Sequence, residues 1–106
     1  MQQTCRDLEQ LEARAADVAL EDQSRVFNTE LIAALELYNM LDVARAVAGA
    51  AAARKESRGA HTRRDAPTRD DANFLHHSLC RFDPAGPRLE KKDVTLGHWV
   101  PEERKY

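Results

Sequence analysis

The positions of glycine and proline divide this chain into two unlike halves. All four glycines and all four prolines lie at or after residue 49. Because these residues interrupt regular helices, the first half is free to form long helices and the second half is predicted to be looped or extended. The sequence therefore predicts a mostly α protein, helical within residues 1–57, with a charged loop at 58–72 and a hairpin-like, extended tail at 73–106.

The length and charge of the chain limit what it can be. With 106 residues there is room for one modest core, so we expect residues 1–106 to form a single domain. The longest apolar run is too short to span a bilayer, and the first twenty residues do not resemble a signal peptide. The net charge of −2 combines nearly balanced cations and anions, which does not favour nucleic-acid binding.

Two helices are predicted in the first half. The first is amphipathic, with Leu8, Leu11, Ala15 and Val18 on one stripe. The second is predicted to begin near Asn28, an N-cap residue type, with Glu30 close to the positive end of the helix dipole. Phe27 is expected to pack on Ile32 as a hydrophobic staple.

The second helix carries apolar residues on two sides. One side holds Leu31, Leu35, Tyr38 and Leu41, and another holds Leu37, Met40, Ala44 and Val47. A helix that is apolar on two sides is expected to lie between neighbours.

A hairpin is predicted after the charged loop. Residues 73–82 and 88–96 flank the sequence DPAGP, in which Asp-Pro-x-Gly is typical of a turn with glycine at positive φ. The remaining stretch, GHWVPEERKY, has too little apolar surface for a core of its own and is expected to lie across something else.

Motifs for catalysis, metal binding and phosphate binding are missing from the sequence. His61, His76, His77 and His98 do not have metal-ligand spacing, so we predict no metal site. The two cysteines, Cys5 and Cys80, lack CxxC spacing and are expected to be small buried side chains in a reducing compartment. Glycine-rich phosphate-binding motifs do not occur.

The stretch ARKESRGAHTRRDAPTRDD at residues 53–71 holds six cations and four acids. Gly59 is expected to end the second helix in a left-handed conformation, with Arg54, Lys55 and Arg58 near the negative end of its dipole. The remaining alternation of charges suits ion pairing. A docking seam, a solvated loop and, less favoured, a nucleic-acid patch remain open on these grounds.

Several motifs together resemble one family. These are FNT.L..ALEL.N.LD.A at 27–44, ARKESRGAH at 53–61, R.D.P.RDD.N at 63–73 and VTL..W.PEERKY at 94–106. This combination resembles the C-terminal region of the flavoprotein subunit of succinate dehydrogenase and fumarate reductase, from about residue 24 to residue 106. L-aspartate oxidase is similar through SRG.H and the acidic-proline loop, but the W.PEERKY ending favours the dehydrogenase and reductase side.

The resemblance implies a fold, an activity and partners. It implies a roughly three-helix, spectrin-repeat-like bundle with an extended tail, packed on the flavin-binding domain of a larger flavoprotein. The parent subunit would carry FAD on a histidine, interconvert succinate and fumarate, and pass electrons to an iron–sulfur subunit. This chain would hold no cofactor and be inactive alone. The parent complex would be cytoplasmic and peripheral to the inner face of the cell membrane.

No catalytic or cofactor-binding residue of the family falls on a position of this chain. The charged segment is instead interpreted as a structural and interdomain element. Its residues are Arg54, Glu56, Ser57, Arg58, Gly59, His61, Arg63, Asp65, Arg69 and Asp70. The alternative reading is a free-standing helical interaction module with an arginine-rich docking loop.

Overall fold

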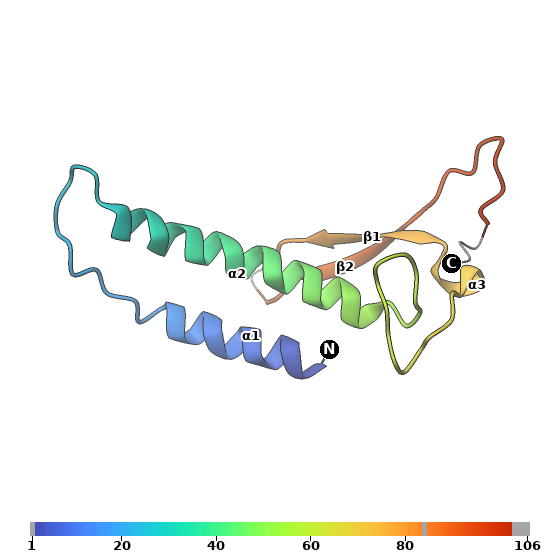
Figure 1. The fold of residues 1–106 in the computed structure, drawn as a ribbon, viewed down its shortest axis with the longest axis horizontal. Coiled ribbons are helices and arrows are strands. Elements are labelled where there is room, and N and C mark those ends of the chain that lie inside the picture. Colours follow the sequence, from blue (N-terminus) through green and yellow to red (C-terminus); the bar gives the residue numbers. More distant parts are fainter. Residues whose placement is uncertain (1, 84, 103–106) are drawn as a thin grey trace. The chain divides into compact units, whose positions relative to one another are not determined.

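A computed structural model describes residues 2–83 and 85–102. Figure 1 shows its elements: helices α1 (Gln2–Ala15), α2 (Thr29–Ala53) and α3 (Asp71–Phe74), and strands β1 (His76–Arg81) and β2 (Arg88–Asp93). The predicted class, mostly helical with a hairpin, is confirmed. A spectrin-like bundle is not confirmed, because α3 has only 4 residues. No helix in the described ranges is long and apolar enough to cross a membrane.

The chain divides into two compact units, residues 1–49 and 50–106. In the first unit α1 lies antiparallel to the part of α2 that belongs to this unit (Figure 1). The Tyr38 hydroxyl donates to the Ala15 carbonyl at 2.8 Å, and Arg45 pairs with Glu12 at 2.6 Å. Leu41 is buried with Ala15, as expected from the apolar stripes of the two helices. The formation of one domain by residues 1–106 stays a prediction.

The beginning of α2 agrees with the sequence, but the hydrophobic staple is wrong. Asn28 Oδ1 accepts a hydrogen bond from the Leu31 amide at 2.8 Å, which caps the helix as predicted. Phe27 is 94% exposed and has a φ of 52°, so its ring cannot pack on Ile32. A positive φ turns the Phe27 side chain in a direction that the staple does not allow for.

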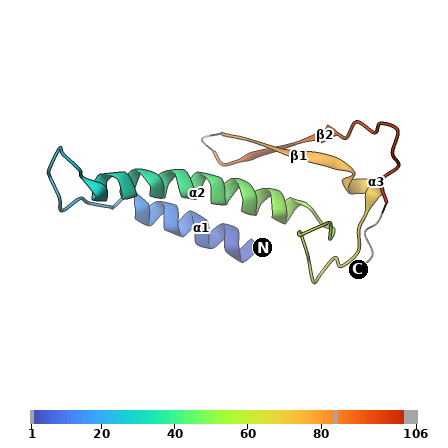
Figure 2. The ribbon, with the colours of Figure 1, turned by 45° about the horizontal axis from the view of Figure 1, so that its top comes forward.

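In the second unit β1 and β2 form an antiparallel hairpin (Figure 2). The register pairs His76 with Asp93 at one end and Arg81 with Arg88 at the other. The Gly86 amide donates to the Asp83 carbonyl at 2.9 Å and Gly86 has a φ of 123°, which confirms the predicted glycine conformation in this turn.

Both hairpin arms are shorter than predicted. Residues 71–74 form α3, where residues 71–72 were predicted as loop and residues 73–74 as the beginning of the hairpin. The Asp70 carboxylate accepts a hydrogen bond from the Asn73 amide at 3.1 Å and caps this helical turn. Trp99 and Val100 of the predicted tail are exposed. Pro84 of the turn and residues 103–106 of the tail lie outside the described residues.

Candidate functional site

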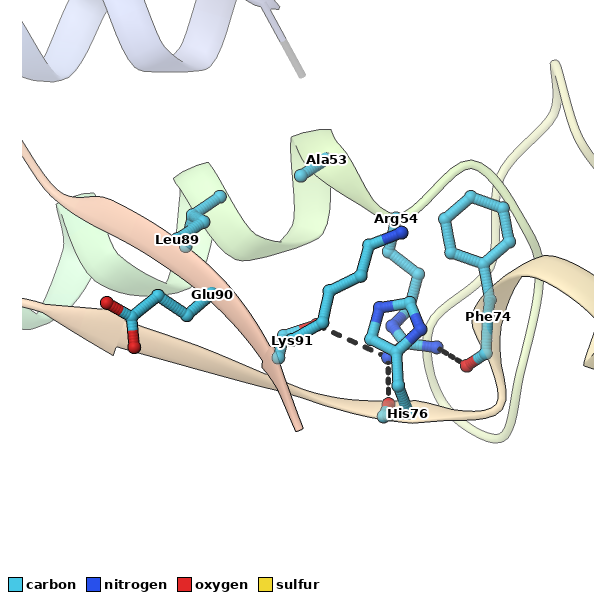
Figure 3. A pocket seen from close by; sticks show the side chains of 8 residues that line it. Ala53, Arg54, Phe74, His76, Leu89, Glu90 and Lys91 are labelled. Carbon is cyan, nitrogen blue, oxygen red and sulfur yellow. Dashed lines mark hydrogen bonds between the residues drawn. The ribbon is translucent and has the colours of Figure 1, made fainter. Parts of the chain in front are cut away.

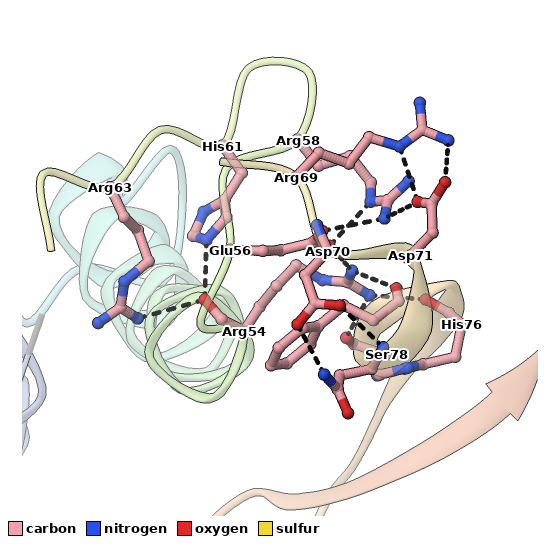
Figure 4. A network of polar contacts seen from close by, with 12 residues as sticks. Arg54, Glu56, Arg58, His61, Arg63, Arg69, Asp70, Asp71, His76 and Ser78 are labelled. Carbon is pink, nitrogen blue, oxygen red and sulfur yellow. Dashed lines mark hydrogen bonds and ion pairs between the residues drawn. The ribbon is translucent and has the colours of Figure 1, made fainter. Parts of the chain in front are cut away.

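Glu56 is the centre of the charged segment. Its side chain is 0% exposed. One edge of the carboxylate accepts hydrogen bonds from Arg58 Nε at 2.8 Å and Arg58 Nη2 at 2.9 Å, as Figure 4 shows. The Asp70 amide donates to Oε2 at 2.9 Å, and Arg54 Nη1 donates to Oε1. A fully buried carboxylate therefore has a complete set of donors.

These contacts keep Glu56 ionised. Burial by itself raises the pKa of this carboxyl group, because the charged form loses its hydration. The hydrogen bonds from Arg58, the Asp70 amide and Arg54 outweigh burial and lower the pKa to about 2. Glu56 therefore carries its charge at neutral pH, and with a pKa this low and both oxygens already accepting hydrogen bonds it is a poor proton acceptor.

Arg54 joins this centre to the beginning of the hairpin. It follows the last residue of α2, and its guanidinium donates to the Phe74 carbonyl at 2.8 Å and the His76 carbonyl at 2.6 Å. It also donates to Ser78 Oγ at 3.2 Å. Arg54 Cζ lies 5.9 Å from the centroid of the Phe74 ring, within cation–π range. One side chain therefore holds the end of a helix to two later elements.

Asp71 extends the network toward the surface. Its carboxylate accepts hydrogen bonds from Arg69 Nε at 2.7 Å and Nη2 at 2.6 Å, and from Arg58 Nη2 at 2.6 Å. Arg69, and then Arg58, lower the pKa of Asp71 to about 2. Arg69 Nη1 donates to the Glu102 carbonyl at 2.7 Å, which ties the tail to the network.

Gly59 has the predicted backbone conformation but a different role. Its φ is 57°, and it lies at the tip of a tight turn in which the Arg58 amide donates to the His61 carbonyl at 2.8 Å. The His61 amide returns a hydrogen bond to the Arg58 carbonyl at 3.0 Å. The expectation that Gly59 ends the helix is wrong, because α2 ends at Ala53. Residues 54–57 were predicted as helical, but they lie beyond the end of α2, and Arg54 and Glu56 belong to the ion-pair network.

Arg63 caps α2 in place of a glycine. Its Nη1 donates to the carbonyls of Ala51 at 3.3 Å, Ala52 at 3.1 Å and Arg54 at 3.2 Å. A cation at this position also interacts favourably with the helix dipole. The other edge of the guanidinium pairs with Asp65 at 2.9 Å and 2.6 Å. Arg63 lowers the pKa of Asp65 to about 2.

Ser57 and His61 complete the loop. The Ser57 hydroxyl donates to the Ala66 carbonyl at 2.7 Å and accepts from the Arg63 amide at 2.9 Å. His61 Nε2 lies 3.2 Å from the Arg54 carbonyl. Every residue of the predicted interdomain set thus lies in or beside one network. Asp71 and Ser78 belong to the network but were not in the predicted interdomain set. The position of Asp71 in a run of acids next to Arg69 could have indicated its ion pair.

A pocket of about 240 Å³ lies beside the network (Figure 3). It is lined by Ala53, Arg54, Phe74, His76, Ser78, Leu89, Glu90 and Lys91. Burial, followed by the charges of Lys91 and Arg54, lowers the pKa of His76. Burial and the two cations therefore disfavour the charged form of the His76 ring.

The arrangement is that of a structural ion-pair network. In the described part of the chain, every buried side-chain nitrogen and oxygen has a hydrogen-bond partner.

Within residues 2–83 and 85–102, no group of three His, Cys, Asp or Glu side chains is arranged to hold a metal ion. Cys80 is exposed and Cys5 is half-buried, so the expectation of two buried cysteines is wrong.

The family model described as "Fumarate reductase flavoprotein C-term" matches residues 1–106. The chain belongs to this family. The resemblance predicted from the sequence motifs is therefore confirmed.

Relatives in this fumarate reductase flavoprotein family are identical to the chain at close to half of the aligned positions. The fumarate reductase flavoprotein subunit of Escherichia coli is 46% identical over 109 residues, covering 100% of this chain and 18% of the relative. That of Mycobacterium tuberculosis is 48% identical over 97 residues, covering 91% and 17%. The succinate dehydrogenase flavoprotein subunit of Rickettsia conorii is 48% identical over 81 residues, covering 76% and 14%.

A solved structure shares the fold of this family member. A chain of a mutant E. coli quinol fumarate reductase superposes with a TM-score of 0.90 at 43% sequence identity, covering 96% of this chain and 18% of that chain. The chain thus spans less than a fifth of the length of each of these relatives.

Proposed function

We propose that this chain forms the C-terminal part of a flavoprotein subunit that interconverts succinate and fumarate. The observation that carries the proposal is the family match over residues 1–106, with relatives on both the fumarate reductase and succinate dehydrogenase sides. FAD and the residues that bind the dicarboxylate would belong to the part of the subunit that lies outside this chain. The cofactor would supply the hydride chemistry.

The proposed role of the chain is to support the flavin-binding domain by packing against it. The carboxylates of Glu56, Asp65 and Asp71 are already paired with arginines, which leaves none of them poised for proton transfer. A loop fixed by this many ion pairs is a rigid surface, and rigid surfaces lose little entropy when they dock. The ten interdomain residues predicted from the sequence would form or support this seam.

The exposed side of α2 suggests a third helix. Ile32, Met40, Val43 and Val47 recur at helical spacing within the first unit and are 55–64% exposed. These apolar side chains share one helix face with the charged Glu36, and exposed apolar side chains gathered on one face are often covered by a partner. A helix from elsewhere in the subunit would cover it and complete a roughly spectrin-repeat-like bundle.

The partners and location follow from the same proposal. The chain would contact the flavin-binding domain of its own subunit, and the subunit would pass electrons to an iron–sulfur subunit. The complex would lie in the cytoplasm against the inner face of the cell membrane. Contact of this chain with the membrane would be indirect, and nucleic acid would not be a partner.

The deciding experiment is to isolate the native gene product and measure its mass and near-UV and visible absorbance. A protein several times longer than this chain, with bound flavin and succinate-dependent dye reduction, is the expected result. The 106-residue chain, mixed with FAD, succinate and dichlorophenolindophenol, should show no turnover above a heat-treated control. A colourless native product of this length would refute the proposal and favour a free-standing interaction module.

The seam has its own test by amide hydrogen exchange. Residues 58–66 are expected to exchange more slowly in the longer subunit than in the 106-residue chain, because the flavin-binding domain would cover them. Equal rates in both proteins would leave this segment as a solvated loop.

A further inference from the structure

Phe27 has an unusual backbone conformation and an unusual exposure at the same time. Among the described residues other than glycine, Phe27 is the one with a positive φ, which is 52°. This region is disfavoured for a bulky side chain, and glycine or asparagine would adopt it more readily. The ring is also 94% exposed, so it makes almost no apolar contact within the chain.

The surrounding loop holds this conformation in place. The Glu30 carboxylate accepts hydrogen bonds from the amides of Glu21 at 3.1 Å and Asp22 at 2.7 Å. The Asn28 side chain donates to the carbonyls of Asp22 at 2.8 Å and Ser24 at 3.0 Å. Both sides of Phe27 are therefore anchored to α2. Strained conformations persist where the surroundings fix them, and they cluster at binding sites.

We infer that Phe27 is an anchor that inserts into an apolar pocket on the part of the flavoprotein subunit outside this chain. The inference rests on the proposed function, because it requires a longer subunit. The E. coli relative is matched over only 18% of its length, so the greater part of such a subunit would be available as the occupant. An aromatic ring held on a fixed loop is typical of an interface anchor, because little freedom remains to be lost.

The test uses limited trypsin digestion of the full-length, flavin-bearing subunit. Arg25 is exposed in this chain and lies two residues before Phe27, so cleavage after it reports whether the loop is docked. In the wild-type subunit the site should be protected relative to the 106-residue chain. Phe27→Ala should raise the cleavage rate about tenfold or more, because undocking makes the loop accessible.

Val26→Ala is the matched control. Val26 is 72% exposed in the same loop but does not have a positive φ, so its replacement should leave protection close to wild type. Alanine, like phenylalanine, has a Cβ that disfavours positive φ, so the strain at position 27 remains in the variant. The difference in cleavage rate between the two variants therefore reports the loss of the Phe27 ring. All rates are divided by the cleavage rate of the same variant after unfolding.

Three results would overturn the inference while leaving the proposed function intact, provided the purified subunit contains flavin. The first is cleavage of the wild-type subunit after Arg25 as fast as cleavage of the chain. The second is equal cleavage of the Phe27→Ala and Val26→Ala subunits. The third is an effect of Phe27→Ala on self-association of the 106-residue chain alone, which would make a second copy the occupant. A native product without flavin would refute the proposed function first.

Discussion

Replacing Glu56 by glutamine should strongly destabilise the second unit. The substitution keeps the shape of the side chain but removes a charge that is 0% exposed and bonded to Arg54 and Arg58. It also places an NH₂ group among donors, so at least one buried donor loses its acceptor. Removing one partner of a buried ion pair costs about 3 to 5 kcal/mol. We expect Glu56→Gln to lower the free energy of unfolding by about that amount.

The pH dependence gives a second magnitude for the same site. The pKa of Glu56 falls from its ordinary value of 4.5 to about 2 in the folded protein. A difference of this size corresponds to about 3 kcal/mol of stability. Because the folded-state pKa is the lower one, this stability is fully present above pH 4.5 and is lost as the pH falls toward 2.

Urea unfolding of the 106-residue chain, followed by far-UV circular dichroism, checks both magnitudes. At pH 7 the midpoint for Glu56→Gln should fall by about 1 to 3 M relative to wild type. Between pH 5 and pH 2 the wild type should lose about 3 kcal/mol more stability than the variant does.

Asp65→Asn is the control for the effect of burial. The pKa of Asp65 is also about 2, but its side chain is 70% exposed and its ion-pair partner is Arg63. Because solvent screens this exposed pair, Asp65→Asn should destabilise the chain far less than Glu56→Gln does. If Glu56→Gln cost no more than Asp65→Asn, the reasoning from burial and completed hydrogen bonds would be refuted.

Two other predictions concern the ends of α2. Asn28→Ala removes the cap on the Leu31 amide together with the hydrogen bonds to the Asp22 and Ser24 carbonyls, and should cost about 1 to 2 kcal/mol in urea unfolding. Thr29→Ala should cost less than half of that. Equal costs would argue against capping by Asn28. Arg63→Ala removes a donor that three carbonyls share and should also cost about 1 to 2 kcal/mol, while the exposed neighbour Arg64→Ala should stay within about 0.5 kcal/mol. Indistinguishable midpoints for the two arginine variants would contradict the capping role.

The features that could be predicted from the sequence are local ones. The beginning of α2 depends on Asn28 and the amides that follow it, and capping residues act within one turn. The hairpin depends on a turn with glycine at its end, and Gly86 has the positive φ that its type and position indicate. Each of these features involves neighbours that the sequence displays side by side.

The features that could not be predicted depend on residues far apart in the chain. The sequence predicts a helix that continues to residue 57 because Gly59 is expected to end it, yet α2 ends at Ala53, where Arg63 donates hydrogen bonds to the last carbonyls. Glu56 is surrounded by donors from Arg58, Arg54 and the Asp70 amide, and nothing near it in the sequence shows that they converge. Tertiary contacts of this kind override local propensity.

A charge in place of an apolar core also affects how the second unit responds to temperature. Among the described residues of the second unit, Glu56 is the one with a buried side chain. The buried apolar side chains of the described residues, Ala15, Leu41 and Ala48, all lie in the first unit. Apolar burial is the main source of the heat-capacity increase on unfolding, and the cost of dehydrating charges falls on heating. The second unit should therefore have a shallow stability curve, and warming should weaken it less than it weakens the pair of helices that precedes it.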